Sequence, residues 1–176
     1  MFHRLRSAFP TGVTVVTTVD RDGAPKGLTL QAFLFVSSEP PLVLVCLDAT
    51  SRTLGLLREH GSFVVNFLSS GRESLSNLFA SKEEDKFASV QWRGSGIAKG
   101  APILFADVVA YAECVISREI AAGDHQIFLA SVDGGEFIGG LPLMYFRRTY
   151  GTWDGDCRAA STRHRSAARG LRRGRP

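Results

Sequence analysis

The sequence predicts a mainly β protein, an antiparallel barrel carrying a few short helices. Short apolar runs rich in β-branched residues recur along the chain, and turn residues separate them. Helical spacing occurs only in brief stretches, and no segment repeats at a period of roughly 20–50 residues. The 176 residues suffice to enclose one hydrophobic core. Together these observations favour a single barrel domain.

The first half of the predicted barrel begins with an amphipathic helix over residues 2–9. Residues 13–19 are dense in valine and threonine, which indicates a strand. The Asp-Gly and Pro signals in residues 20–25 predict a hairpin turn. We expect the return strand over residues 26–36, and a second buried strand over residues 42–47.

The middle of the chain predicts helices between strands. Ser51 stands where a helix N-cap is expected, and Gly61 is typical of a helix end. Residues 63–68 read as a strand. Residues 73–79 and 83–87 predict two further short helices.

The last third predicts a long hairpin and a final strand. Residues 106–120 alternate small and apolar side chains, and the Gly123-Asp124 turn leads into a strand over residues 126–132. Residues 141–147 predict the last strand. We place the folded domain at residues 1–157.

The net positive charge of the chain comes from its final segment. Of the 21 basic residues, seven are arginines in residues 158–176, which contain no acidic residue. The remaining chain therefore carries 14 basic and 17 acidic groups. We expect residues 158–176 to be a solvated, disordered tail. A nucleic-acid-binding function would rest on this tail alone.

Several classes of site are absent from the sequence. The cysteines Cys46, Cys114 and Cys157 are odd in number and widely spaced, which argues against a disulfide framework and a zinc site. No phosphate-binding P-loop, dinucleotide glycine motif, nucleophile elbow or zincin motif is present. We expect no metal and no membrane span. Without an apolar leader at the N-terminus, a cytoplasmic location is the default expectation.

Three segments carry candidate chemistry. Residues 48–53 join a buried strand to a helix N-terminus, where backbone N–H groups, hydroxyls and Arg52 suit a phosphate; a plain N-cap is the alternative. Thr29, Gln31 and Phe33 share one strand face that would orient a heteroaromatic ring, or would simply face solvent. His125 opens a strand at a tight turn, where it would touch a ligand or serve only the turn.

At these segments the chain resembles the short-chain flavin reductases, the reductase components of two-component flavin-dependent monooxygenases and halogenases. The likeness extends from about Phe2 to Tyr150. Its landmarks occur in order along the chain, and each alone is a weak signal. They include Phe9-Pro10-Thr11-Gly12-Val13, Asp22-Gly23, Ser51-x-Thr53, Gly61-x-Phe63-x-Val65-Asn66, Phe79-Ala80-Ser81, Asp85-Lys86-Phe87, Gly123-Asp124-His125 and Pro142-Leu143-x-Tyr145.

The resemblance implies an FMN-binding split barrel, a Greek-key antiparallel β-barrel that works as a homodimer. It also implies FMN or FAD as cofactor, bound non-covalently, and NADH or NADPH as co-substrate. The residues matching the family's flavin contacts are Thr29, Gln31, Ala32, Phe33, Cys46, Leu47, Ser51, Thr53, Phe79, Ala80, Ser81, Lys86 and Phe87. Those matching the nicotinamide side are His125, Tyr145, Phe146 and Arg147.

The chain departs from the family at a few positions. Gln31 and Ala32 replace the Ser or Asn often found there, which bears on ring hydrogen bonding and on FMN or FAD preference. Arg148 replaces a residue that is commonly small. The basic tail is not a family feature.

The activity implied is NAD(P)H-dependent reduction of flavin, with free reduced flavin released to a partner oxygenase. Because both reactants are cofactors, the protein must mainly stack two rings and exclude water. We assign His125 to positioning the nicotinamide and find it no proton-transfer partner in the sequence. A flavoprotein that keeps its flavin and reduces another substrate, and a non-enzymatic flavin or haem binder, stay open as alternatives.

Overall fold

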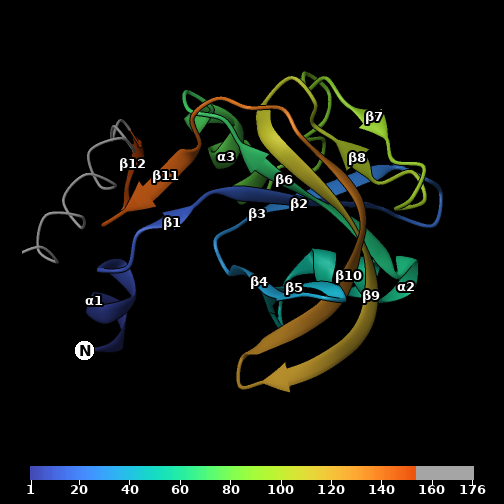
Figure 1. Cartoon of the computed structure of the whole chain (residues 1–176), viewed down its shortest axis with the longest axis horizontal. Coiled ribbons are helices and arrows are strands. Elements are labelled where there is room, and N and C mark those ends of the chain that lie inside the picture. The colour runs from blue at the N-terminus through green and yellow to red at the C-terminus, as the bar shows by residue number, and fades with distance from the viewer. Residues whose placement is uncertain (154–176) are drawn as a thin grey trace, which may run out of the picture.

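The computed structural model describes residues 1–153, so the predicted tail and the domain boundary at 157 lie outside the described residues. Its centre is a seven-stranded sheet in the order β3-β2-β6-β9-β10-β5-β4 (Figure 1). The strands of this sheet are β2 (Thr14–Val19), β3 (Pro25–Leu30), β4 (Phe33–Ser38), β5 (Pro41–Asp48), β6 (Ser62–Leu68), β9 (Val108–Ala122) and β10 (His125–Phe137).

Smaller elements surround this sheet. The remaining strands are β1 (Thr11–Gly12), β11 (Leu143–Phe146) and β12 (Thr149–Thr152) in one small sheet, and β7 (Arg93–Gly94) with β8 (Pro102–Ile103) in another. The helices are α1 (Phe2–Ser7), α2 (Arg52–His60) and α3 (Glu73–Ala80). Among the described residues, no helix is long and apolar enough to cross a membrane.

The predicted mainly β, antiparallel class is confirmed. Each pair of strands in the sheet runs antiparallel. Strands β2 and β6 are neighbours without being consecutive, and so are β5 and β10. Such crossovers are what a Greek-key barrel requires.

The barrel closes at a seam between its two edge strands. Strands β3 and β4 stand at opposite edges of the sheet, yet only Gln31 and Ala32 separate them in sequence. The predicted single strand over residues 26–36 is therefore wrong. Its first part pairs with β2 and its second part pairs with β5, so the chain must leave one ladder before joining the other.

Two apolar cores lie on the two faces of the sheet, and β2 contributes to both. Val15 packs in a core with Phe79 of α3, whereas the next residue, Val16, packs in a core with Leu54 of α2. Because successive side chains of a strand point to opposite faces, a strand covered on both sides reads as a continuous apolar run. This accounts for the uninterrupted burial of β2.

The two helices against the sheet are fixed by local signals and close packing. The predicted N-cap and C-cap of α2 are confirmed: Ser51 Oγ accepts a hydrogen bond from Thr53 N–H at 3.3 Å, and Gly61 adopts φ 72°. Helix α3 approaches β3 at Gly27, where an added Cβ would lie 2.9 Å from the Phe79 ring. A side chain at this position would push the helix away from the sheet.

The helix predicted over residues 83–87 is absent; the segment is irregular, with bends at residues 84, 86 and 87. Local side chains take the backbone donors there: Ser81 Oγ accepts from Glu83 N–H at 3.1 Å, and Asp85 Oδ1 accepts from Phe87 N–H at 3.3 Å. Such bonds compete with helix formation in short segments. The segment is nevertheless anchored, because Phe87 is buried against Phe79 with ring centroids 5.0 Å apart.

The last predicted strand is shorter than expected and is followed by a strand that the sequence did not indicate. Within the predicted 141–147 strand, β11 spans four residues, and Arg147 and Arg148 form the turn into β12. Both turn residues have positive φ, 49° and 65°. A turn of this kind usually contains Asn or Gly, so two arginines gave no turn signal.

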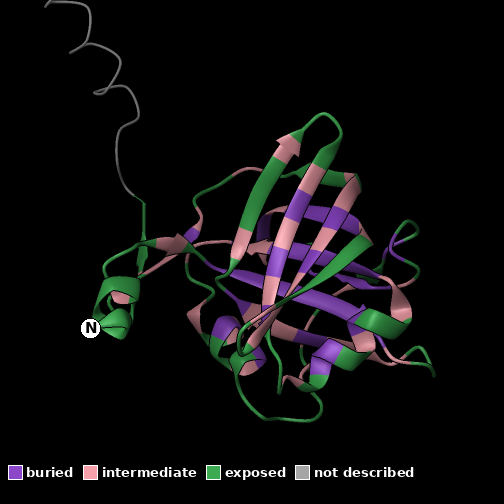
Figure 2. Cartoon of the chain, turned by 90° about the horizontal axis from the view of Figure 1, so that it is seen from below, coloured by how far each residue is buried: buried purple, intermediate pink, exposed green. Residues whose placement is uncertain are grey.

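Helix α1 has no buried residue and stands apart from the barrel (Figure 2). Its apolar side chains Phe2 and Leu5 are 73% and 62% exposed, and Phe9 just after it is 73% exposed. An isolated six-residue helix is unstable in water. The helix therefore requires a covering surface that its own barrel does not supply.

Candidate functional site

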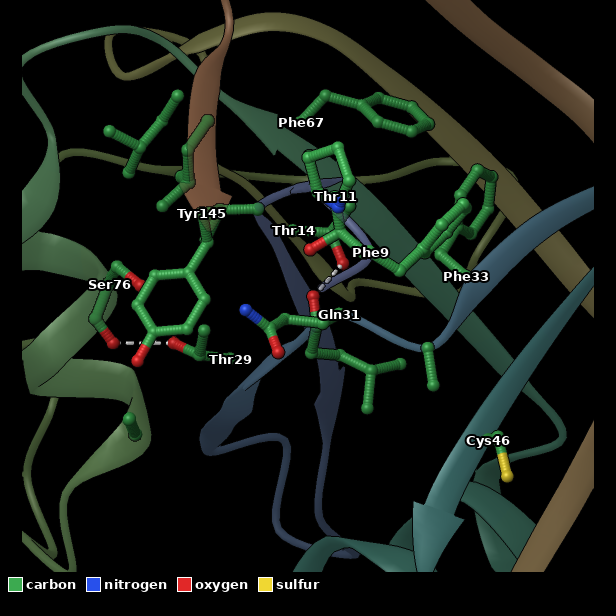
Figure 3. Close-up of a pocket in the computed structure, with 18 of the residues that line it drawn as sticks. Phe9, Thr11, Thr14, Thr29, Gln31, Phe33, Cys46, Phe67, Ser76 and Tyr145 are labelled. Carbon is green, nitrogen blue, oxygen red and sulfur yellow. Dashed lines mark hydrogen bonds between the residues drawn. The ribbon is translucent and has the colours of Figure 1, made fainter. Parts of the chain in front are cut away.

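A groove of about 1470 Å³ opens along the seam between β3 and β4 (Figure 3). Its walls come from α1, the strands beside the seam, and the β11–β12 hairpin. Many of the predicted site residues line it: Thr29, Gln31, Ala32, Phe33, Cys46, Ser51, Ala80, His125, Tyr145 and Arg147. The other predicted residues lie outside this lining: Leu47, Thr53, Phe79, Ser81, Lys86, Phe87 and Phe146.

The residues outside the lining differ in burial, and Lys86 among them is half-buried. Leu47, Phe79 and Phe87 are buried in the apolar cores, and Thr53 is buried in the first turn of α2. Ser81 and Phe146 are exposed. We therefore expect the core residues to shape the groove from behind rather than through their side chains.

One wall of the groove is a chain of hydrogen-bonded polar groups. Thr29 Oγ1 donates to Ser76 O at 2.6 Å (Figure 3). The Ser76 hydroxyl lies 3.0 Å from Tyr150 Oη. Tyr150 Oη donates to Asn77 Oδ1 at 2.9 Å. The hydroxyl hydrogen of Thr29 is thus engaged, which leaves its oxygen as an acceptor toward the groove.

Gln31 and Thr11 supply polar groups that the described residues leave without partners. Gln31 is exposed in the groove, and no described residue bonds its side-chain amide. Thr11 Oγ1 is buried and also lacks a partner within residues 1–153. An unpaired buried hydroxyl carries a desolvation cost that a bound ligand would relieve.

Aromatic rings form the facing wall. Phe33 packs edge-on against Phe35 and Phe67, with centroids 4.9 and 5.1 Å away. Phe35 and Phe67 stack at 6.1 Å. Sequence reasoning found Phe33 but missed the other two, because Phe67 joins the wall from a strand more than thirty residues later. Aromatic walls of this kind suit a flat ring system.

The start of α2 and the side chains beside it form an ordered region, which we call the α2 region (Asp48, Ser51, Arg52 and Lys86). Of these residues, Asp48 and Ser51 line the groove. Asp48 Oδ1 accepts bonds from Thr50 N–H at 2.7 Å and Thr50 Oγ1 at 2.6 Å. These bonds, and more weakly the His125 charge, hold the pKa of Asp48 below its ordinary value. The carboxylate is therefore ionised and tied to its own loop.

Two cationic side chains, Arg52 and Lys86, belong to this region at the N-terminus of α2. Arg52 donates to Lys82 O at 3.0 Å, and Lys86 donates to Phe79 O at 2.8 Å near the end of α3. Burial and the nearby Arg52 charge lower the pKa of Lys86. Two cations that repel each other beside a helix N-terminus favour an anion there.

His125 is held by its neighbour in sequence. Its Nδ1 lies 2.7 Å from Asp124 Oδ1, and His125 faces Asp48 across the β5–β10 ladder. The hydrogen bond from His125 is the main cause that lowers the pKa of Asp124. Sequence reasoning found no partner for His125 and missed Asp124, although the adjacent carboxylate was the available signal. The contact leaves Nε2 without a partner among residues 1–153.

The groove holds no activated nucleophile among the described residues. Cys46 is half-buried in the wall, and burial, with a smaller contribution from Asp124, raises the pKa of its thiol. No group of three potential metal ligands occurs within residues 1–153. The arrangement is suited to binding and aligning flat, anionic ligands rather than to acid–base or metal chemistry.

Comparison with protein families identifies this chain's relatives. Residues 5–154 match the flavin reductase like domain. The chain is 47% identical over 154 residues to an NADH flavin reductase of Kitasatospora aureofaciens, covering 86% of this chain and 80% of the relative. It is 38% identical over 152 residues to an NADPH flavin reductase of Lentzea aerocolonigenes, covering 86% and 88%.

Solved structures with a similar fold are also found. Component B of a nitrilotriacetate monooxygenase from Mycobacterium thermoresistibile is 35% identical, with a TM-score of 0.81 over 86% of this chain and 84% of that one. The NADH:FAD oxidoreductase SgcE6 of Streptomyces globisporus, in complex with NAD and FAD fragments, is 32% identical. Its TM-score is 0.82, covering 89% of this chain and 93% of that one. The predicted split-barrel fold is thereby confirmed.

Proposed function

The chain belongs to the flavin reductase like domain family, and we propose that it reduces FMN or FAD with NADH or NADPH and releases the reduced flavin to a partner oxygenase. The observation that carries this proposal is the groove at the seam. Its volume of about 1470 Å³ exceeds the roughly 300–1,000 Å³ of a site for one drug-sized ligand. Two ring systems, one from each cofactor, can therefore lie in it together.

The residues of the groove fit a flavin. The isoalloxazine ring would lie along residues 29–33, against the aromatic wall, with the Gln31 amide and the unpaired Thr11 hydroxyl within the same groove. Ser51 and the backbone N–H groups of the first α2 turn would hold the phosphate, with Arg52 and Lys86 supplying positive charge. Lys86 already bonds two carbonyl groups, so its contribution is its charge rather than a direct contact.

The nicotinamide would be placed by His125 and Tyr145. Because Asp124 fixes one ring nitrogen of His125, the other is left to contact the carboxamide of the nicotinamide. Tyr145 packs against Tyr150 at 4.9 Å, which places an aromatic face at the groove. These roles follow the family motif Gly123-Asp124-His125 and stay predictions.

The protein's part in the reaction is alignment. When bound, the flavin supplies N5 as the acceptor of the hydride from nicotinamide C4. The aromatic wall and the polar wall would hold the two rings face to face, and the apolar lining would exclude water from between them. Backbone N–H groups of Gln31 and Ala32, which have no backbone acceptor among residues 1–153, would stabilise negative charge on the reduced ring. None of these roles needs a proton donor or a metal.

We also propose that the chain works as a homodimer in the cytoplasm, where both nicotinamide cofactors are present. The exposed apolar side chains of α1 support the dimer, because the helix finds no cover on its own barrel. Multi-angle light scattering of the full chain should give a dimer mass, and Leu5→Lys should shift it toward monomer. A wild-type monomer at micromolar concentration would exclude this assembly.

The decisive experiment for the function is NADH and NADPH consumption with and without added FMN or FAD. We expect oxidation to depend saturably on free flavin, and the reduced flavin to support a flavin-dependent oxygenase supplied in a separate preparation. Turnover that needs no added flavin would instead show a flavoprotein that keeps its cofactor. No turnover under any combination would refute the proposal. Deletion of residues 158–176 should leave the rate unchanged.

A further inference from the structure

The turn between β11 and β12 presents two arginines to the groove in an unfavourable backbone conformation. Arg147 and Arg148 both line the groove and both have φ in the left-handed region, at 49° and 65°. The flanking residues Phe146 and Thr149 close the hairpin as a paired position, so the two arginines form its whole turn. Asn and Gly adopt such a turn readily, whereas side chains such as arginine are strained in it.

The two guanidinium groups have no acidic partner within the described residues. No salt bridge or hydrogen bond of Arg147 or Arg148 occurs in residues 1–153. Arg147 lies over the Phe146 ring, 5.0 Å from its centroid, which restrains the side chain while leaving its N–H groups available. Both residues are exposed to the groove solvent.

Further positive charge gathers at the same place. His3 and Arg6 of α1 line the same groove, and Figure 1 shows α1 beside the β11–β12 hairpin at one end of the molecule. We call this set the hairpin region (His3, Arg6, Arg147 and Arg148). Among residues 1–153, Asp48 is the only acidic residue that lines the groove; it belongs to the α2 region, and Thr50 donates hydrogen bonds to its carboxylate. Arg6, Arg147 and Arg148 thus bring three guanidinium groups to this end of the groove, with no salt bridge to any of them among residues 1–153.

We propose that the Arg147–Arg148 turn is a subsite for a phosphate of a dinucleotide's adenosine half, with the 2′-phosphate of NADPH as its first candidate. Planar guanidinium groups bind phosphate oxygens through paired hydrogen bonds. Tyr145, at the predicted nicotinamide position, lies two residues before the turn on the same strand. The turn therefore stands where the remainder of the dinucleotide leaves the ring site. This inference rests on the proposed function and gives the chain a preference for NADPH over NADH.

The test separates the charge of the turn from its shape. Arg148→Gly removes the charge and suits the left-handed conformation, so the hairpin should fold at least as well as in the wild type. Arg148→Lys keeps the charge. Arg118→Asn is the matched control, because Arg118 is an exposed arginine on β9 outside the groove. Melting temperature and calorimetric titration with NADP⁺, NAD⁺, FAD and FMN are measured for each full-length variant.

We expect Arg148→Gly to weaken NADP⁺ binding relative to NAD⁺ by about tenfold, the scale of a lost charge-assisted hydrogen bond. The lysine variant should retain much of the preference, and the Arg118 variant all of it. A selective loss for FAD relative to FMN would assign the same subsite to the flavin pyrophosphate. An unchanged NADP⁺/NAD⁺ ratio together with an unchanged FAD/FMN ratio would overturn the subsite. Because titration needs no turnover, this outcome is independent of whether flavin is reduced.

Discussion

Asp48 and Ser51 of the α2 region line the same groove as the hairpin region, but the two regions are built in different ways. In the α2 region, Ser51, Asp48 and Arg52 each make hydrogen bonds within the chain before any ligand arrives. In the hairpin region, Arg147 and Arg148 have no hydrogen-bond or ionic partner among residues 1–153, and α1 has no buried residue. The first is preorganised by the barrel, whereas a bound ligand would supply the missing partners of the second.

This contrast matches what each region would hold. The α2 region would receive the flavin phosphate, and its order would reduce the entropy lost on binding. The hairpin region would meet the adenosine half of a dinucleotide that must enter and leave in every cycle. A loosely held charge cluster favours fast exchange, since little protein structure must be rearranged for release.

The largest expected effect concerns the close packing of α3 against β3, which we expect to stabilise the barrel. Gly27→Ala should lower the free energy of unfolding by about 1–3 kcal/mol, because the new Cβ would lie 2.9 Å from Phe79 and 3.1 Å from Val16 O. Urea denaturation followed by circular dichroism measures it. Gly55→Ala in α2 is the control, where no atom lies within 4 Å and no loss is expected. Equal stability of the two variants would show that the close approach is unimportant.

An effect of similar size tests the α2 region directly. Ser51→Asp should keep the helix cap yet repel a phosphate, so FMN binding should weaken by about 1.5–3 kcal/mol, the range for hydrogen bonds to charged groups. Fluorescence titration with FMN measures this. Ser51→Asn caps without added charge and should bind FMN more tightly than Ser51→Asp. Riboflavin, which has no phosphate, should bind all three proteins alike; equal losses for riboflavin would remove the phosphate from this region.

A smaller effect is expected at His125, which lies opposite Asp48 of the α2 region. His125→Ala should raise the KM for NADH by about three- to tenfold, the scale of one lost hydrogen bond, while flavin affinity is retained. Steady-state kinetics at saturating flavin, with flavin titration as the control, separates the two. An unchanged KM would take His125 out of the nicotinamide site. Asp124→Asn should give an intermediate change, because the ring keeps a partner with less charge.

The last test concerns the core behind the groove, through the buried thiol of Cys114. Burial raises the pKa of Cys114 to about 12 from an ordinary 9.0. The unfolded thiol ionises first, so stability should fall as pH rises from about 9 toward 12. The slope due to this group is at most about 1.4 kcal/mol per pH unit. Urea denaturation of wild type and Cys114→Ala across this range isolates it, since the variant has no thiol there to ionise; parallel curves would contradict the shift.

The sequence predicted those elements whose signals are local. The start of α2 at Ser51 and its end at Gly61 follow from cap chemistry, which neighbouring residues determine. The break of the long strand at Gln31 was not predictable in this way, because it depends on which distant strand each half joins. Strand β12 was missed for a third reason: its turn consists of arginines, which carry no turn signal.

The residues that line the groove were predicted to a similar extent. Residues 29–33 were found because they share one continuous segment and match family landmarks. Phe35, Phe67 and Tyr150 were missed, since their place at the groove is set by strand pairing and by contacts across more than seventy residues in the case of Tyr150. Such long-range contacts are not readable from spacing within one segment.

At the seam, the residues exposed to a bound ligand are not the residues that form the strand ladders. Gln31 and Ala32 lie in the groove but belong to neither flanking strand, and their side chains are exposed. Exchanging these side chains would leave the strand ladders intact. A randomised library at these two positions would therefore retain a large folded fraction while varying the surroundings of the bound ring, which makes the junction a favourable starting point for directed evolution of cofactor choice.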